Sequence, residues 1–397
     1  MGKETVSLCM IVKNESRTIK RTLDSVSKFV DEFIIGIDDS VSDGTDRIVK
    51  HWFKKRKKKG EVFFFKWDDN FSKARNLTLK KATKDWIMIL DGHEYFDEKT
   101  KPILNKMFDN LLSSMDFLYL NMLNRETGTI IAQLRLFKNN IGVHYKGRVH
   151  NEVVGHTLDR STLMQGITLI HDRYKPDIAL RAGQREGMIV THMEKKLETE
   201  PNNLRSLFYL TRQYIMLKEY KKSIEYGKRY ISLIHDSLAK AIALGNLAVC
   251  YMHLGDIDNG VKYINETLSA DDTYPYGHLL ASNYHSQRGE FDLAEKCVVQ
   301  AMKCNKIPSS FIPIPISFYT WFPFLTMARV KIDMKKYEEA QKALDIVRTF
   351  NEYFCGGEEE KVIELENVVK DGLANKNKKV NTLSTNDFRL NTWSVVA

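Results

Sequence analysis

Residues 86–94 read Trp-Ile-Met-Ile-Leu-Asp-Gly-His-Glu, a run of bulky apolar side chains that stops abruptly on polar ones. A short apolar block followed by glycine is typical of a central parallel strand in an α/β sheet. Ligands of such sheets bind outside the carboxyl ends of the strands. Alternate strand residues point the same way, so we expect Asp91 and His93 to face one ligand. A strand ending in Asp-x-His is more often a polar rim than a metal site. Whether it is a metal site here therefore depends on the neighbouring motifs.

The segments before this strand predict three β-α units. Strands are expected at Val6–Val12, Glu32–Ile37 and Glu61–Trp67, each an apolar run followed by a helical pattern. Asp38 follows the second strand, where the base or ribose of a nucleotide could be read. This order of units is typical of a nucleotide-binding α/β sheet.

The pattern changes after the Trp86 strand. A helix at about Lys99–Ser113 is followed by alternating strands at Phe117–Leu123 and Ile130–Phe137, whose link, Asn124–Gly128, predicts a hairpin. Beyond the hairpin lie clustered histidines and acids that can serve acid–base or metal-ligand chemistry. They are His144, His150, Glu152, His171 and Asp172.

Composition bounds the class of protein. A chain of 397 residues with 43% apolar and 28% charged residues is expected to form two or three globular domains. No apolar run reaches membrane-span length and no signal peptide precedes the first strand, so we expect a cytoplasmic protein. The five scattered cysteines are expected to be reduced. The net charge of +9 favours anionic partners without choosing among them.

From Gln184 onward the sequence is helical, and turn-like breaks separate pairs of amphipathic segments. The second segment of each pair opens at Tyr220, Ile257, Phe291 and Tyr337, at intervals of 37, 34 and 46 residues. The middle interval is the tetratricopeptide period, which favours a repeat over a generic helical bundle. The last contains an insertion, residues 307–324, whose Pro313–Pro315 loop could border an acceptor groove or form a packed crossover.

Five motifs occur in order within about the first 175 residues. They are Met10-Ile11-Val12-Lys13-Asn14-Glu15; Asp38 with Ser42-Asp43-Gly44-Thr45; Asn70-Phe71-Ser72-Lys73-Ala74-Arg75-Asn76; Trp86 through Asp91-Gly92-His93-Glu94; and Gly147-Arg148-Val149-His150-Asn151-Glu152. Together they resemble the family-2 inverting glycosyltransferases of the GT-A fold. The similarity is to the branch that carries tetratricopeptide repeats and includes the sublancin-type S-glycosyltransferases.

The resemblance implies an α/β GT-A domain, Rossmann-like and binding a nucleotide-diphospho-sugar, followed by an all-α tetratricopeptide-like solenoid. We place the catalytic domain at residues 1–178, the repeats at residues 179–375 and a flexible tail at residues 376–397.

The resemblance also implies roles for individual residues. Nucleotide-sugar binding falls to Val12, Asn14, Glu15, Asp38, Arg75, Asp91, Gly92 and Arg148. For a divalent metal the resemblance implies Asp91 and His93. His171 is added as a third ligand because its cluster of histidines and acids can supply metal-ligand chemistry facing them. Glu152 is the first choice as general base, with Glu94 as the alternative.

Two departures from the family pattern affect these roles. Asn70 stands where the family has an aspartate, and His93 stands where it has a metal-binding carboxylate. An imidazole suits Mn²⁺ better than Mg²⁺, so we expect manganese.

The expected function is inverting transfer of a sugar from a UDP-sugar to a protein or peptide. Two alternatives stay open. The basic run Lys54–Lys59 could contact nucleic acid as an acceptor, although such runs are usually solvated helix ends. The chain could instead be a repeat scaffold that has lost activity through Asn70 and His93. A homodimer formed through the repeats is a further expectation.

Overall fold

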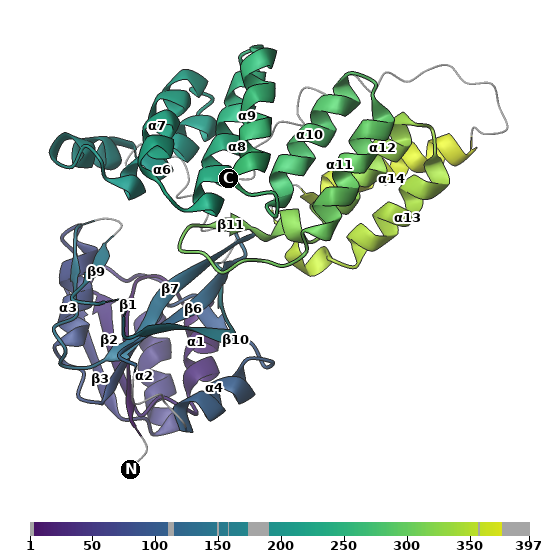
Figure 1. Cartoon of the computed structure of the whole chain (residues 1–397). Coiled ribbons are helices and arrows are strands. Elements are labelled where there is room, and N and C mark those ends of the chain that lie inside the picture. The colour runs from purple at the N-terminus through teal and green to yellow at the C-terminus, as the bar shows by residue number, and fades with distance from the viewer. Residues whose placement is uncertain are drawn as a thin grey trace. The chain divides into compact units, whose positions relative to one another are not determined.

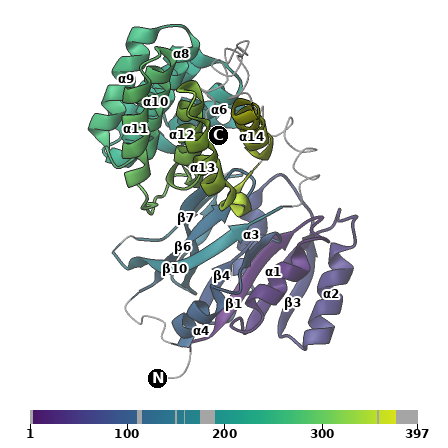
Figure 2. The ribbon, with the colours of Figure 1, turned by 90° about the vertical axis from the view of Figure 1, so that its right-hand side faces the viewer.

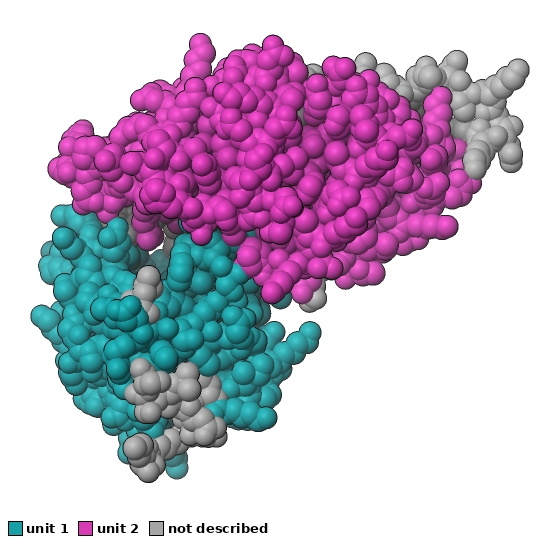
Figure 3. All heavy atoms as spheres, in the orientation of Figure 1, with its two compact units in different colours: residues 1–180, 309–314 teal, residues 181–308, 315–397 magenta. Residues whose placement is uncertain are grey.

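The computed structural model describes residues 4–109, 115–148, 151–157, 159–173, 190–355 and 358–374 (Figure 1). The chain divides into two compact units, residues 1–180 with 309–314, and residues 181–308 with 315–397 (Figure 3). The first unit is built on a mixed sheet and the second from paired helices, which confirms the predicted fold class. The predicted domain boundary and the predicted tail lie outside the described residues.

Four parallel strands form one half of the sheet, in the order β3-β2-β1-β4. They are β1 (Val6–Val12), β2 (Glu32–Asp38), β3 (Gly60–Phe65) and β4 (Trp86–Ile89). The helices between them are α1 (Ile19–Val26), α2 (Thr45–Arg56) and α3 (Phe71–Leu79). Strands β1, β2 and β4 are buried along almost their whole length, as their apolar sequences predict for strands covered on both faces.

The other half of the sheet continues from β4 in the order β7-β6-β10-β5. Its strands are β5 (Glu94–Phe96), β6 (Phe117–Asn124), β7 (Thr129–Lys138) and β10 (Ser161–His171). Strands β6 and β7 form the predicted antiparallel hairpin. A separate hairpin pairs β8 (His144–Lys146) with β9 (Glu152–Val154), and helix α4 spans Lys101–Asp109.

The structure corrects the expectation for the Trp86 strand in two ways. Strand β4 is central, but it pairs in parallel with β1 and antiparallel with β7, because the hairpin returns the chain beside it. The strand also ends at Ile89. The N–H of Glu94 donates to the carbonyl of Asp91 at 3.0 Å, which closes a turn leading into β5. Asp91 and His93 therefore lie in a turn and do not alternate along one strand.

The two faces of the sheet carry different helices. Helices α1 and α2 cover one face (Figure 2). On this face Leu23 and Trp52 pack in the same buried cluster as Phe33. Helix α3 covers the opposite face, where Leu79 packs against a cluster containing Ile87. Both faces are thus covered, and polar side chains are left to the loops at the strand ends.

The second unit consists of helices that pack in consecutive pairs. They are α6 (Leu204–Met216), α7 (Tyr220–Leu233), α8 (Ser237–His253), α9 (Ile257–Ala270), α10 (Pro275–Gln287), α11 (Phe291–Lys303), α12 (Phe322–Asp333), α13 (Tyr337–Arg348) and α14 (Glu358–Ala374). The second helices of the first four pairs begin at the four predicted residues. No helix in the described ranges is long and apolar enough to cross a membrane.

The same kind of turn joins the two helices in each of these four pairs. Its first feature is a left-handed residue, with φ between 58° and 76°, at Lys218, Gly255, Gly289 and Lys335. The next N–H then donates to the carbonyl five residues back, at 2.8–3.0 Å. This bond satisfies a carbonyl of the last helical turn, as in the Schellman motif. Four equivalent turns are the structural counterpart of the sequence repeat.

Residues 309–314 belong to the sheet unit although they follow α11 in the chain. The N–H of Ala132 donates to the carbonyl of Ser310 at 2.7 Å, and the ring of Phe311 lies 5.1 Å from that of Tyr119. Strand β11 (Ile314–Pro315) also pairs with β7. Because β4 pairs with β7 only at residues 136–138, the earlier part of that edge needs another hydrogen-bonding partner.

Candidate functional site

The loop after β1 packs against the turn after β4. Oε1 of Glu15 lies 2.9 Å from Nδ1 of His93. A Cβ atom added to Gly92 would lie 2.9 Å from Cγ of Glu15 and 3.1 Å from Cγ1 of Val12, so the approach requires glycine. Four of the predicted site residues are thereby brought together at the carboxyl edge of the sheet.

Asp91 forms an ion pair with a side chain from α3. The guanidinium of Arg75 donates to Oδ1 of Asp91 at 2.7 Å, and it also lies over the ring of Tyr145, 5.4 Å from the ring centre. Burial alone would raise the pKa of Asp91, but Arg75 and, further away, Arg135 hold it well below its usual range. Asp91 is therefore a carboxylate at any physiological pH.

Glu94 holds the turn after β4 in place. Its side chain is fully buried, and Oε2 accepts the backbone N–H of Asp91 at 2.9 Å. Oε1 accepts from Arg135 at 2.6 Å and lies 3.4 Å from Nδ1 of His171. Burial raises the pKa of Glu94, but the charge of Arg135 and the hydrogen bond and charge of His171 together lower it, and the net shift is downward. A carboxylate without solvent access, held by three donors, is well placed to orient Asp91 and poorly placed to exchange protons with an acceptor.

His93 is buried, and both of its ring nitrogens have partners. Nδ1 contacts Glu15, and Nε2 lies 3.3 Å from Nε–H of Arg173. Because an arginine can only donate, Nε2 is the acceptor, which places the ring proton on Nδ1 facing Glu15. The ring of His93 is therefore fixed in orientation.

His171, the last residue of β10, lies edge-to-face against His93 with 4.4 Å between ring centres. Its ring nitrogens contact two carboxylates, Glu94 at 3.4 Å and Glu126 at 3.3 Å. Burial would lower the pKa of His171, but the two acids raise it to about 9. The imidazolium form therefore predominates at neutral pH.

Asp91, His93 and His171 match a manganese site in their chemistry, because two imidazoles and a carboxylate suit a transition-metal ion. Within the described ranges, no three acidic, histidine or cysteine side chains are already arranged to hold a metal ion. Nε2 of His93 faces Arg173, and Nε2 of His171 faces Glu126. These two neighbours would have to withdraw, and His171 would have to lose a proton, before the rings could act as ligands.

Asp38 closes β2 and is only 2% exposed. It accepts hydrogen bonds from the N–H and hydroxyl of Ser40 at 2.8 and 2.5 Å, and Lys13 lies 3.3 Å away. Burial raises the pKa of Asp38, but these hydrogen bonds and Lys13 lower it overall. In the neighbouring loop, Oδ1 of Asn14 accepts the N–H of Ser42 at 3.0 Å. Both predicted residues fix the loops in which a nucleotide base is expected to lie.

The β8–β9 hairpin carries Glu152 and is attached to α3. The side-chain amide of Asn76 donates to the carbonyl of Tyr145 at 2.9 Å and accepts its N–H at 2.8 Å. Glu152 is half-buried on β9. Arg148 is exposed beside the start of α3 and donates to the carbonyl of Asp68 at 2.9 Å. His150 lies outside the described residues. Through Tyr145, the hairpin adjoins Arg75.

Three contributors to the site were not predicted from sequence: Glu126, Arg135 and Arg173. Arg135 did carry a signal, because it is a charged residue inside the apolar strand Thr129–Lys138 and is only 6% exposed. A buried charge needs a partner, so a search for a buried acid would have linked it to Glu94. Glu126 and Arg173 lie in polar segments, where a charge carries no such signal.

With this geometry in place, comparison with known proteins defines the class. Residues 7–132 match the family model of Glycosyl transferase family 2, so the chain contains a glycosyltransferase domain of that family. The chain is 29% identical over 233 residues to the SPbeta prophage-derived glycosyltransferase SunS of Bacillus subtilis, covering 57% of this chain and 53% of SunS. The chain thus spans about half the length of that relative.

A second relative is a TPR repeat-containing protein of Synechococcus elongatus, 33% identical over 160 residues, or 38% of this chain and 36% of that protein. Among solved structures, the mannosyltransferase PcManGT of Pyrobaculum calidifontis, in complex with GDP-Man and Mn²⁺, is 14% identical. The match covers 77% of this chain and 88% of PcManGT with a TM-score of 0.40.

Proposed function

We propose that the protein is an inverting glycosyltransferase that moves a sugar from a UDP-sugar to a side chain of a protein or peptide. The observation that carries the proposal is the ion pair of Asp91 and Arg75 beside His93, at the carboxyl edge of the family-2 domain. Ligands of open α/β sheets bind at this edge.

In this proposal the donor lies across the loops that follow β1, β2 and β4. Asp38 and Asn14 lie on the side of the uracil, and Asp91 accepts hydroxyl groups of the ribose or sugar. The Arg75–Asp91 ion pair keeps that carboxylate ionised, and an ionised carboxylate accepts stronger hydrogen bonds than a neutral one. Arg148, exposed beside α3, supplies positive charge toward the diphosphate.

Asp91, His93 and His171 are the proposed ligands of Mn²⁺. A bound ion would supply positive charge for the departing diphosphate. The protein's own part is to hold the two rings in place, through Glu15 on His93 and Glu94 on His171.

Glu152 is the proposed general base. The acceptor atom forms a bond to the anomeric carbon, Glu152 takes the acceptor's proton, and the bond from the anomeric carbon to the diphosphate oxygen breaks. The nucleoside diphosphate leaves with the bonding electron pair, and the anomeric configuration inverts. Glu94 is the weaker candidate because its carboxylate is fully buried and already held by Arg135.

The helical unit supports a protein or peptide acceptor. Paired helices that repeat with equivalent turns form the kind of solenoid whose concave face binds extended chains. The family resemblance points the same way, through its peptide-modifying branch. A homodimer formed through this unit remains a prediction.

The direct test is intact-mass analysis of candidate peptides incubated with the full chain and a panel of sugar nucleotides. We expect a mass increase of one sugar residue that requires the wild-type protein and is lost in Asp91→Ala. The same mixtures without peptide report hydrolysis of the sugar nucleotide. If neither transfer nor hydrolysis occurs with any donor, in Mn²⁺ or Mg²⁺, the proposal fails and the scaffold alternative gains support.

A further inference from the structure

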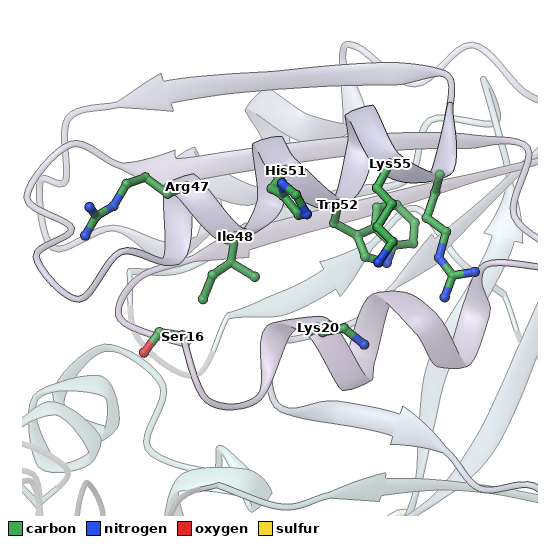
Figure 4. A pocket seen from close by; sticks show the side chains of 8 residues that line it. Ser16, Lys20, Arg47, Ile48, His51, Trp52 and Lys55 are labelled. Atoms are coloured by element: carbon green, nitrogen blue, oxygen red, sulfur yellow. The ribbon is translucent and has the colours of Figure 1, made fainter.

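A pocket of about 440 Å³ lies between α1 and α2, on the face of the sheet that these helices cover (Figure 4). Its lining residues are Ser16, Lys20, Arg47, Ile48, His51, Trp52, Lys55 and Arg56. Five of these eight side chains are basic and none is acidic. The pocket shares no residue with the proposed donor and metal sites, and the proposed reaction leaves it without a role.

Asp24 organises one end of this pocket. Its carboxylate accepts from Lys20 at 2.7 Å, from Arg56 at 3.0 Å and from Nε1 of Trp52 at 2.9 Å. Trp52 is only 4% exposed, so it forms a fixed wall. One carboxylate therefore holds two cations at the pocket edge without neutralising both of them.

The remaining basic residues belong to one stripe of α2. Arg47, His51 and Lys55 follow one another at intervals of four residues, which places them on the same helix face. Figure 4 shows Arg47 and Lys55 toward opposite ends of this stripe, with Lys20 facing it from α1.

The acids that contact the lining residues do not balance these charges. Besides Asp24, Asp43 lies at the Ser16 end, where it accepts the N–H of Ser16 at 2.8 Å. Lys20, Arg47, Lys55 and Arg56 still outnumber these two carboxylates. Such an excess of cations along a concave surface favours an anion with several separated charges.

We propose that this pocket binds a small molecule carrying two or more phosphate groups. Guanidinium and ammonium groups from two helices can each contact a different phosphate, and charge-assisted contacts of this kind are the strong ones. The volume lies in the range of small-molecule sites. Trp52 is too buried to stack on a base, which disfavours a single-stranded nucleic acid. The proposal is independent of the proposed transfer reaction.

The test is calorimetric titration of the full chain with sodium tripolyphosphate, in the presence of saturating UDP so that the donor site is filled. The test variant is Lys20→Gln with Lys55→Gln. The control is Lys54→Gln with Lys59→Gln, which removes the same charge from nearby exposed positions outside the pocket lining. We expect the test variant to lose about tenfold or more in affinity, because two charge-assisted contacts are removed, while the control stays close to wild type.

Equal affinities of the two double variants would overturn the proposal, and so would an absence of tripolyphosphate binding to the wild-type chain. A single-stranded oligonucleotide that binds more tightly than tripolyphosphate, and depends on Lys20 and Lys55, would replace the small molecule with nucleic acid. Thermal unfolding midpoints of both variants check that the fold is retained. Sugar transfer is measured separately, so failure here leaves the proposed function untouched.

Discussion

Arg135 donates to Oε1 of Glu94 at 2.6 Å, in an ion pair whose side chains are only 8% and 0% exposed. Glu94 in turn accepts the backbone N–H of Asp91, so this buried pair sets the position of the proposed donor-binding carboxylate. Two consecutive hydrogen bonds, from Arg135 to Glu94 and from Asp91 to Glu94, thus connect the core to the proposed donor site.

Replacing Arg135 with Met should strongly destabilise the sheet unit, because it leaves the buried Glu94 without its main cation. Removal of one partner of a buried ion pair typically costs about 3–5 kcal/mol. Adding Glu94→Gln to Arg135→Met removes the uncompensated charge and should restore much of the loss. Urea unfolding of the single and double variants measures both effects.

The matched control is Arg160→Met, which breaks an exposed pair with Asp116 and should change stability little. Equal losses in Arg135→Met and Arg160→Met would contradict this role.

Asp91→Ala should abolish transfer and weaken UDP binding, since the side chain is proposed to contact the donor directly. Asp38→Ala should weaken UDP binding, because it removes the side chain that fixes the loop proposed to contact the uracil base. Isothermal calorimetry with UDP measures both variants. Unchanged UDP affinity in the two proteins would place the donor elsewhere.

His93→Asp should shift metal preference from Mn²⁺ toward Mg²⁺, because a hard cation prefers oxygen ligands. The measurement is the metal dependence of UDP affinity, which needs no acceptor. Arg173→Gln provides a second test, since it removes the group that now contacts Nε2 of His93 and should strengthen Mn²⁺ binding. Identical metal profiles for wild type and His93→Asp would show that His93 is not a ligand.

Glu152→Gln should leave donor binding intact and lower the transfer rate by about a hundredfold or more, the usual contribution of a positioned acid–base group. Glu94→Gln should act differently: its effect should extend to UDP binding, because Glu94 orients Asp91. Steady-state kinetics and UDP calorimetry on both variants separate these outcomes. A rate loss confined to Glu94→Gln would mean that the base has been misassigned.

Sequence reasoning succeeded where one local pattern determined the structure. The apolar runs gave β1, β2 and β4, the Asn124–Gly128 link gave the hairpin, and four breaks gave the starts of the second helices. It failed at the end of β4, where the alternating pattern of a strand gives way to a local turn. The expectation that Asp91 and His93 alternate along a strand was wrong, because the turn is closed by Glu94.

At the site, the limit was contacts between segments that lie far apart in the sequence. Sequence motifs placed Glu15, Arg75, Asp91 and His93 in one region, and the structure brings these four side chains together. Periodicity could not show that both histidines lie among carboxylates and arginines, since Glu126 comes from a turn between two other strands. Contacts of that kind depend on strand order, and strand order is not encoded in any one segment.

Residues 309–314 also affect the order in which the protein can assemble on the ribosome. Strand β7 emerges long before Ser310, so the N–H of Ala132 gains its acceptor only after α11 has been synthesised. The sheet unit therefore cannot be completed while only the amino-terminal part of the chain has been synthesised. Until then one strand edge stays unpaired, and unpaired strand edges promote aggregation in large proteins. A fragment ending before residue 309 would keep that open edge permanently. Removal of the helical unit is therefore a change to the sheet as well, and acceptor binding is better tested by point substitutions on α6 to α13 in the full chain.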